Sequence, residues 1–333
     1  MRRTRRVLLP SAAAAVLALG AAGTSPAQAG DAPRAPGSGP AAVAAPVAAP
    51  VPAQSGADPR TAATALERYW TTARMAKALP AVAPKSGPAE PGTLRQGPTG
   101  EPGSIAPAPP ARGTRADTAG VGKVFYTHPA DGKDYFCSAS ALASPSKQLV
   151  ITAAHCVNEG GTNGTAGRYV SNWVYVPAFR SGTRPHGTFQ AKEFRAFSGW
   201  VNSSDLRLDI AMVTTRPLSG RKLIDVTGGN GLSWNYDRQQ TVTVAGYSFD
   251  HNTGQIQRSC RSTASPLPAP DERVQIQCAF RGGGGPWLRN PVASSGLGHV
   301  NGVVSTLITG GWNRSSYFDD AVKAMWDAQG GRT

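Results

Sequence analysis

A histidine and an aspartate, each next to an apolar run, are the residues of this sequence best suited to carry out chemistry. His155 follows the run 149–154 and precedes Cys156, and Asp209 comes directly before the run 210–213. An imidazole can take the proton of a nucleophile, and a carboxylate can fix the tautomer of that imidazole. An acid that leads into an apolar strand is drawn into a low-dielectric site, where it must be paired to stay charged. The two residues therefore predict the base and the orienting acid of an acyl-transfer site.

Three short segments resemble the chymotrypsin/trypsin-like serine peptidases. They are Thr-Ala-Ala-His-Cys around His155, with Cys137 upstream, Asp-Ile-Ala at Asp209, and Gly-Gly-Pro-Trp-Leu at 284–288. The resemblance covers roughly residues 60–330. It implies a serine-type endopeptidase scaffold in which His155 is the general base and Asp209 its partner. Asp205 is the rival acid, but it belongs to a polar run and is expected to be solvated.

The serine loop is where this sequence departs from that family. The family pattern is Gly-x-Ser-Gly-Gly-Pro, whereas residues 281–286 read Arg-Gly-Gly-Gly-Gly-Pro and have Gly283 at the serine position. A deletion of two serines from a relative reading Gly-Gly-Ser-Ser-Gly-Gly-Pro describes the loop equally well. Residues 277–293 contain no serine or threonine, and Ser294 and Ser295 fall in a loop expected to point away from the histidine. We therefore expect the nucleophile to be missing.

The same resemblance assigns the residues around the nucleophile. In the family, backbone N–H groups of the serine loop bind the oxyanion, and the corresponding residues here are Arg281, Gly282 and Gly283. Gly282 stands where trypsin-like zymogens often have an aspartate that pairs with a new N-terminus, so activation by N-terminal insertion is not expected. Three residues are expected to bind substrate: Gln277, Ser305 and Thr306.

Four cysteines in an exported chain favour two disulfides. The sequence alone allows three pairings of residues 137, 156, 260 and 278. Loop sizes and the family resemblance favour Cys137–Cys156 and Cys260–Cys278. No metal-ligand spacing is visible, and the glycine-rich loop lacks the Lys, Ser or Thr of a phosphate cradle, so we expect neither a metal nor another cofactor.

The first 29 residues have the features of a signal peptide. Four arginines precede an apolar stretch, 7–23, and Ala-Gln-Ala precedes Gly30. Pro10 and Ser11 interrupt the apolar stretch and no stop-transfer pattern follows, so we expect a secreted chain without a membrane anchor. The net charge is +14, but no basic run is interleaved with aromatic residues, so nucleic-acid binding is not expected.

Residues 30–118 are predicted to be a propeptide. Segments 30–60 and 80–118 are rich in Pro, Ala, Gly and Ser, and we expect them to be extended and mobile. Proteolytic trimming is expected near Arg112 and Arg115.

A short helix is expected near residues 59–79, between those two segments. Leu66, Trp70, Ala73 and Lys77 recur at helical spacing until a proline ends the run. Such a helix is marginal on its own, or it docks its Tyr69–Trp70 face on the domain that follows. The run from Tyr69 onward resembles a prosegment element of secreted bacterial members of the family, which implies that the chain's own propeptide is a partner.

Residues 119–333 are predicted to be all-β with a C-terminal helix. Short strands alternate with Gly, Pro and Asn turns, and Asp319 and Asp320 lie in the first turn of the helix, which ends at Gly330. We predict two antiparallel six-stranded β-barrels of the chymotrypsin type. The expected strands are 122–127, 173–176, 210–214, 241–245, 273–279 and 302–307.

Three functions are consistent with these observations. The first is a secreted serine peptidase homologue without a nucleophile, which acts by binding a peptide or a protein in its cleft. Loss of the triad serine lowers kcat about 10⁶-fold in a well-studied serine peptidase, which is the reason to expect a dead or strongly impaired enzyme. The alternatives are an active secreted endopeptidase with an unforeseen nucleophile, and an exported structural or adhesion domain.

Overall fold

The computed structural model describes five segments of the chain, all within one structural unit, residues 38–333: 45–51, 59–83, 100–111, 119–162 and 164–333. The predicted signal peptide, residues 1–29, and the predicted trimming sites Arg112 and Arg115 lie outside them. No helix in the described segments is long and apolar enough to span a membrane.

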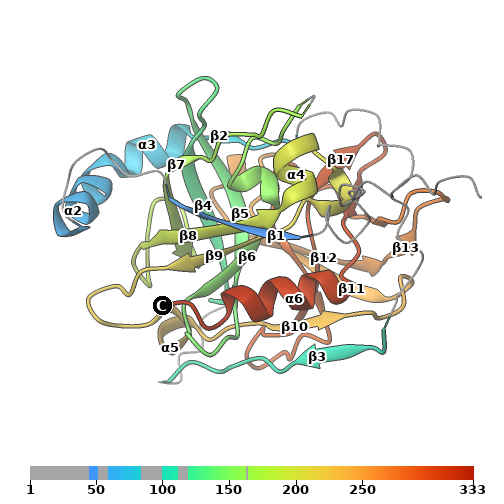
Figure 1. The fold of residues 1–333 in the computed structure, drawn as a ribbon. Helices are drawn as coiled ribbons and strands as arrows, with labels where there is room; N and C mark the ends of the chain where they lie inside the picture. Colours follow the sequence, from blue (N-terminus) through green and yellow to red (C-terminus); the bar gives the residue numbers. More distant parts are fainter. Residues whose placement is uncertain (1–44, 52–58, 84–99, 112–118, 163) are drawn as a thin grey trace, which may run out of the picture. The chain divides into compact units, whose positions relative to one another are not determined.

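Figure 1 draws the elements and labels many of them. The helices are α2 (Pro59–Tyr69), α3 (Thr72–Lys77), η1 (Ala154–Cys156), α4 (Ser198–Ser203), η2 (Leu206–Leu208), α5 (Leu223–Thr227), η3 (Asn252–Gly254) and α6 (Asp320–Gln329). The strands are β1 (Pro46–Pro50), β2 (Leu79–Pro80), β3 (Gly103–Ile105), β4 (Val121–Thr127), β5 (Asp134–Leu142), β6 (Leu149–Thr152), β7 (Ser171–Pro177), β8 (Phe189–Phe197), β9 (Ala211–Thr215), β10 (Gly231–Trp234), β11 (Thr241–Gly246), β12 (Arg258–Thr263), β13 (Ser265–Pro266), β14 (Val274–Gln277), β15 (Pro286–Arg289), β16 (His299–Val303), β17 (Thr306–Ile308) and β18 (Trp312–Ser315).

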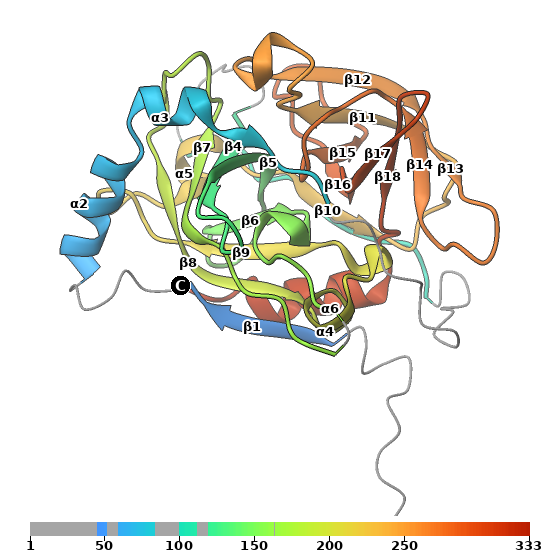
Figure 2. The same cartoon turned by 90° about the horizontal axis from the view of Figure 1, so that it is seen from above.

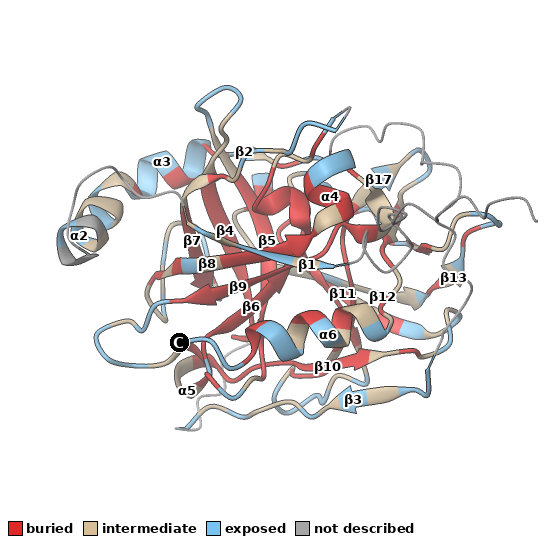
Figure 3. Ribbon diagram, viewed as in Figure 1, coloured by how far each residue is buried: buried red, intermediate tan, exposed pale blue. Residues whose placement is uncertain are grey.

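Six antiparallel strands close into a barrel in the first half of the domain. Their order is β8-β7-β4-β5-β6-β9, and β9 pairs back onto β8. Figure 3 shows that these strands are almost entirely buried. The barrel interior is filled by residues such as Val150, Phe194 and Val213, which share one face of the sheet and are each fully buried. The predicted barrel is therefore confirmed for this half, where His155 lies in the turn after β6 and Asp209 lies two residues before β9.

The second half differs from the predicted closed antiparallel barrel. Its described strands form two sheets, β12-β11-β15-β16-β10-β3 and β13-β14-β18-β17, and β10 pairs in parallel with β16. The two sheets are joined by packing rather than by a continuous ladder. The Cys260–Cys278 disulfide links β12 to the end of β14, and an apolar cluster that includes Ile276 and Trp287 lies with it.

Parts of the predicted propeptide belong to the sheets. The described strands β1 and β3 are extended, as expected, but they are paired in sheets where mobile segments were predicted. Strand β1 pairs antiparallel with β8, from Pro46 opposite Phe197 to Pro50 opposite Glu193, as Figure 2 shows. Strand β3 pairs antiparallel with β10. Prolines are tolerated here because an edge strand needs hydrogen bonds on one side only.

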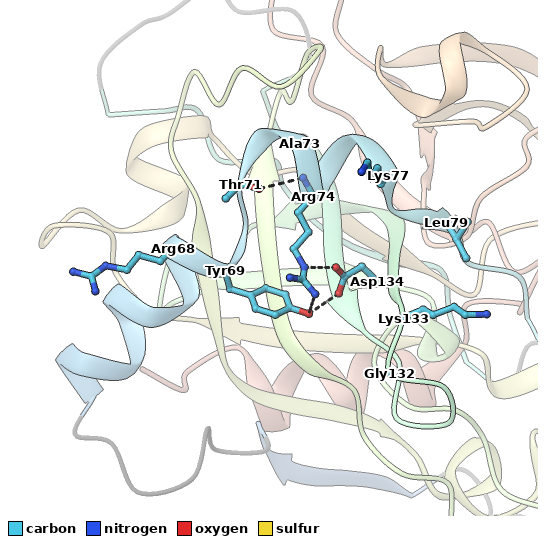
Figure 4. A pocket seen from close by; sticks show the side chains of 10 residues that line it. All are labelled: Arg68, Tyr69, Thr71, Ala73, Arg74, Lys77, Leu79, Gly132, Lys133 and Asp134. Atoms are coloured by element: carbon cyan, nitrogen blue, oxygen red, sulfur yellow. Dashed lines mark hydrogen bonds and ion pairs between the residues drawn. The ribbon is translucent and has the colours of Figure 1, made fainter.

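The helix expected near residues 59–79 is present but broken in two. Thr71 interrupts it and caps α3, since its hydroxyl accepts from the N–H of Arg74 at 3.2 Å. The break turns Trp70 inward, where it is fully buried and its Nε1 donates to the carbonyl of Asn172 at 2.7 Å. The hydroxyl of Tyr69 donates to Asp134 at 2.7 Å, at the pocket shown in Figure 4. The Tyr69–Trp70 face thus lies against the domain.

A buried lysine sits among aromatic rings beside the barrel. The Nζ of Lys123, in β4, lies 3.8 Å from the ring centre of Phe136 and 5.1 Å from those of Phe125 and Phe179. It donates to the carbonyl of Gly254 at 2.6 Å, and no carboxylate pairs with it among the described ion pairs. Burial lowers the pKa of Lys123 to about 7, because the charged form loses its water.

Replacing Lys123 by Met should remove a pH dependence of stability. The unfolded chain, in which the lysine titrates near its ordinary pKa of about 10.4, binds more protons than the folded protein between about pH 7 and 10. The contribution of Lys123 to the free energy of unfolding therefore rises with pH across that window, by up to about 1.4 kcal/mol for each pH unit. We expect Lys123→Met to flatten this rise and to be the more stable protein at pH 6.

Urea unfolding at pH 6, 7.5 and 9 measures the effect. The control is Lys147→Met, because Lys147 is half exposed and its ammonium bonds Asp225 at 2.7 Å. Equal pH slopes in the wild type and in Lys123→Met would contradict the assignment.

Candidate active site

His155 is held at a barrel end by a disulfide. It lies in the turn η1, directly after β6, and the Cys137–Cys156 disulfide ties that turn to β5 with a Cα separation of 6.1 Å. The second disulfide, Cys260–Cys278, has a Cα separation of 5.9 Å. Both predicted pairings are confirmed.

The carboxylate of Asp209 forms two hydrogen bonds with His155. Its Oδ1 accepts from the backbone N–H of His155 at 2.9 Å, and its Oδ2 lies 2.8 Å from the ring Nδ1. The hydroxyl of Ser305 also donates to Oδ2, at 2.6 Å. Since an ionised carboxylate only accepts, the proton of the neutral imidazole is on Nδ1 and Nε2 is left as an acceptor. This is the arrangement a general base requires.

The carboxyl of Asp209 remains ionised despite complete burial. Burial alone would raise its pKa, but the charge of His155 and the hydrogen bonds from His155 and Ser305 outweigh burial and lower the pKa below its ordinary value. The rival acid, Asp205, was expected to be solvated. Its side chain is instead only 12% exposed and forms an ion pair with Arg207 at 2.6 Å, because both lie around the turn η2.

The glycine loop approaches the imidazole too closely for a side chain at residue 283. A Cβ on Gly283 would lie 1.8 Å from His155 Nε2. The loop is pinned there, because the carbonyl of Gly283 accepts from Ser138 N–H and the N–H of Gly284 donates to the Val304 carbonyl, both at 2.7 Å. The imidazole thus occupies the space that a nucleophilic side chain would need.

No described hydrogen bond reaches His155 Nε2, which is buried. Ser294 and Ser295 are exposed in the turn between β15 and β16. The dyad can therefore accept a proton at Nε2, but the described residues hold no hydroxyl or thiol in contact with it.

The predicted oxyanion loop makes internal hydrogen bonds. The N–H of Arg281 donates to the hydroxyl of Ser248 at 2.9 Å, and its carbonyl accepts from Phe249 N–H at 2.8 Å. Gly282 has φ +149°, and a Cβ there would lie 2.8 Å from the carbonyl of Tyr247. One of the three expected oxyanion donors is thus already satisfied. The sequence carried no signal for Ser248, because its contact with the loop spans 33 residues.

The three residues expected to bind substrate separate into two places. Ser305 is buried beside Asp209, which sequence reasoning did not foresee. Gln277 ends β14 opposite Trp312, and Thr306 begins β17 opposite Arg314. Because Trp312 and Arg314 are two residues apart on β18, these pairs share one face of the small sheet.

His155 opens into a pocket of about 600 Å³ on the barrel side. The lining includes Tyr126, Tyr135 and His128, and the segment 80–82 of the predicted propeptide. The hydroxyl of Tyr126 donates to the carbonyl of His155 at 3.4 Å. His128 is half-buried in this pocket.

Comparison with known proteins identifies the fold that carries this site. No family model and no curated protein matches the chain. Among solved structures, the chain is similar to the thermostable serine protease AL20 from an extremophilic microorganism, with 27% identity and a TM-score of 0.59 over 65% of this chain and 99% of that one. The chain has the chymotrypsin-like serine protease fold.

Two further structures support that fold. The protease Anisep from Arthrobacter nicotinovorans is 26% identical, with a TM-score of 0.58 over 69% of this chain and 99% of its own. A Glu endopeptidase is 15% identical, with a TM-score of 0.50 over 68% of this chain and 98% of its own. In this chymotrypsin-like fold, His155 and Asp209 form the dyad and the glycine loop passes against it.

Replacing Gly283 by serine should not create a reactive nucleophile in this chymotrypsin-like site. A side chain in Gly283→Ser must displace His155, whose ring and backbone are both held by Asp209. We expect a loss of about 1–3 kcal/mol of stability from overpacking and no adduct with a fluorophosphonate probe.

Urea unfolding and intact mass measure these two effects. The matched control is Gly331→Ser, because a Cβ at Gly331 meets nothing within 4 Å. A Gly283→Ser protein as stable as the wild type, or one that the probe labels, would contradict the steric reading.

Removing the hydroxyl of Ser305 should make the protein more sensitive to acid. The pKa of Asp209 is lowered on folding, so its contribution to stability is present above the unfolded pKa and is lost as the pH falls through the folded value. Ser305→Ala raises the folded pKa, and we expect the acid-unfolding midpoint to move to higher pH.

At neutral pH the same variant should lose about 1–3 kcal/mol of stability. Circular dichroism during acid and urea titrations measures both effects, with Ser295→Ala, an exposed serine, as the control. An unchanged acid-unfolding midpoint would show that Ser305 does not help to keep Asp209 ionised.

Proposed function

We propose that the chain is a secreted serine peptidase homologue that has lost catalysis and acts by binding an extended peptide or protein segment. The observation that carries the proposal is the missing space at Gly283, where a Cβ would lie 1.8 Å from His155 Nε2. A substitution that merely removed a hydroxyl would leave its volume behind. Here the loop and the imidazole have closed over that volume.

Two requirements of acyl transfer are unmet in this proposal. The dyad has no nucleophile to activate, and the N–H of Arg281 is already bonded to Ser248 rather than free for an oxyanion. His155 could still activate a water molecule, which would then attack the substrate directly. Such residual catalysis falls about 10⁶-fold below that of a complete triad.

What remains of the site supports binding. The His155 pocket, about 600 Å³, offers aromatic surface from Tyr135 and polar groups from His128 and Glu159. Pockets of this size with a few convergent polar groups are the usual ligand sites of proteins. The similar proteins AL20 and Anisep are described as proteases, and proteases bind peptides in extended form.

Export and domain organisation complete the proposal. The two disulfides are stable in an oxidising compartment outside the cytoplasm, in keeping with residues 1–29 as a signal peptide. The AL20 structure covers 65% of this chain, which is the share that residues 119–333 make up. Residues 30–118 are then a propeptide-derived region that stays associated through β1, β2 and β3.

Fluorophosphonate labelling of the secreted wild-type protein, read by intact mass, tests the loss of catalysis. We expect no adduct, because no serine hydroxyl of the described site is hydrogen-bonded to His155 Nε2 and Ser305 is buried against Asp209, while an active trypsin run in parallel is labelled fully. An adduct on the wild type would overturn the proposal and favour an active endopeptidase.

Selection of displayed random peptides on the wild-type protein tests the binding function. We expect enriched peptides whose affinity falls at least tenfold in Tyr135→Ala, within the pocket, and is unchanged in Ser295→Ala, outside it. Failure to enrich any peptide would favour an exported structural or adhesion domain instead.

A further inference from the structure

On one side of β5, beside His155, the neighbouring strand β6 leaves the first residues of β5 without a partner from the barrel. β6 pairs only with residues 140–142 of β5, whereas β4 pairs with residues 134–140 on the other side. The open side at residues 135 and 136 is paired in parallel by Leu79 and Pro80 of β2. The N–H of Ala81 then donates to the carbonyl of Phe136 at 3.0 Å.

The glycine loop continues along the same side of β5. The N–H of Ser138 donates to the carbonyl of Gly283 at 2.7 Å. Phe136 and Ser138 are two residues apart, about 7 Å along a strand. The segment 79–83 therefore ends beside the loop that faces His155, and residues 80–82 line the His155 pocket.

The segment is held weakly where it lies. Pro80 has no N–H to add to the ladder. Ala81 and Ala83 are buried but contribute only methyl groups, while Val82 is 71% exposed and Leu79 43% exposed. A stronger anchor lies upstream, where Met75 of α3 is fully buried. Tethering at α3 gives such a segment a local concentration in the millimolar range, which compensates for weak contacts.

We propose that residues 79–83 are a built-in occupant of this groove, which the ligand must displace. The ligand is an extended peptide that pairs with Tyr135 and Phe136 and carries small residues at two alternate positions. That pattern follows from Ala81 and Ala83, whose side chains are buried two residues apart, whereas the position between them is open. This inference rests on the proposed peptide-binding function and adds its location and its control.

A labelled copy of the segment is the probe for a binding experiment on the full chain. The probe is fluorescein-labelled Lys-Ala-Leu-Pro-Ala-Val-Ala, the sequence of residues 77–83. Ala81→Arg should expel the tethered segment, because a charged side chain cannot be buried at a position only 4% exposed. We expect it to bind the probe at least tenfold more tightly than the wild type, as for a groove occupied nine-tenths of the time.

The matched control is Ala76→Arg, which adds the same charge at an exposed position of α3 outside the His155 pocket. It should bind the probe as weakly as the wild type. Equal affinity of the wild type and Ala81→Arg for the probe would overturn the built-in occupant, as would a gain in Ala76→Arg.

Hydrogen exchange on the wild-type protein gives a second measurement that needs no variant. With excess unlabelled probe, the amide of Ala81 should lose protection while amides of β4 keep theirs. Unchanged protection at saturating probe overturns the proposal. If displayed peptides bind the wild type and Ala81→Arg equally, the occupant is overturned while the peptide-binding function stands, so the two failures are distinguishable.

Discussion

The buried carboxylate of Asp209 is the constraint on which the site depends. A charge at a fully buried position is tolerated only because three hydrogen bonds and the facing imidazole compensate its loss of water. Two of these bonds come from the turn after β6 and the third from Ser305, which precedes β17. One carboxylate thus fastens the closed barrel to the strands of the second half. Its retention is explained by this structural role, whether or not the imidazole still moves protons.

The glycine loop is held in place by its backbone. Hydrogen bonds to Ser138 and Val304 fix Gly283 and Gly284, and the loop lies against the imidazole. A Cβ at Gly284, which has φ +81°, would lie 2.1 Å from the hydroxyl oxygen of Thr152. Two adjacent positions are therefore restricted to glycine, one by the imidazole and one by φ and by neighbouring atoms.

The features that could be predicted are those that show in short stretches of the sequence. His155 and Asp209 were predictable because the apolar runs beside them are visible along the chain. The closed barrel was predicted from the resemblance to the peptidase family, and the choice among three cysteine pairings from that resemblance and the loop sizes. The role of Ser305 was not, because its contact with Asp209 spans 96 residues. Strand β1 was also missed, since a Pro/Ala tract lacks strand propensity and is ordered only by the edge of β8. The parallel pair of β10 and β16 likewise depends on distant partners.

Strands β1 and β3 have a consequence for the edges of the two sheets that they cover. Each covers a row of backbone N–H and C=O groups, on β8 beyond the end of β7 and on the outer side of β10. Uncovered rows of this kind recruit strands from other molecules, and proteins usually protect them with charges, bulges or prolines. Here the protection is a proline-bearing strand from the same chain. We therefore expect β1 and β3 to limit self-association, and a protein cut back to residue 119 to lose solubility before it loses the contact between His155 and Asp209.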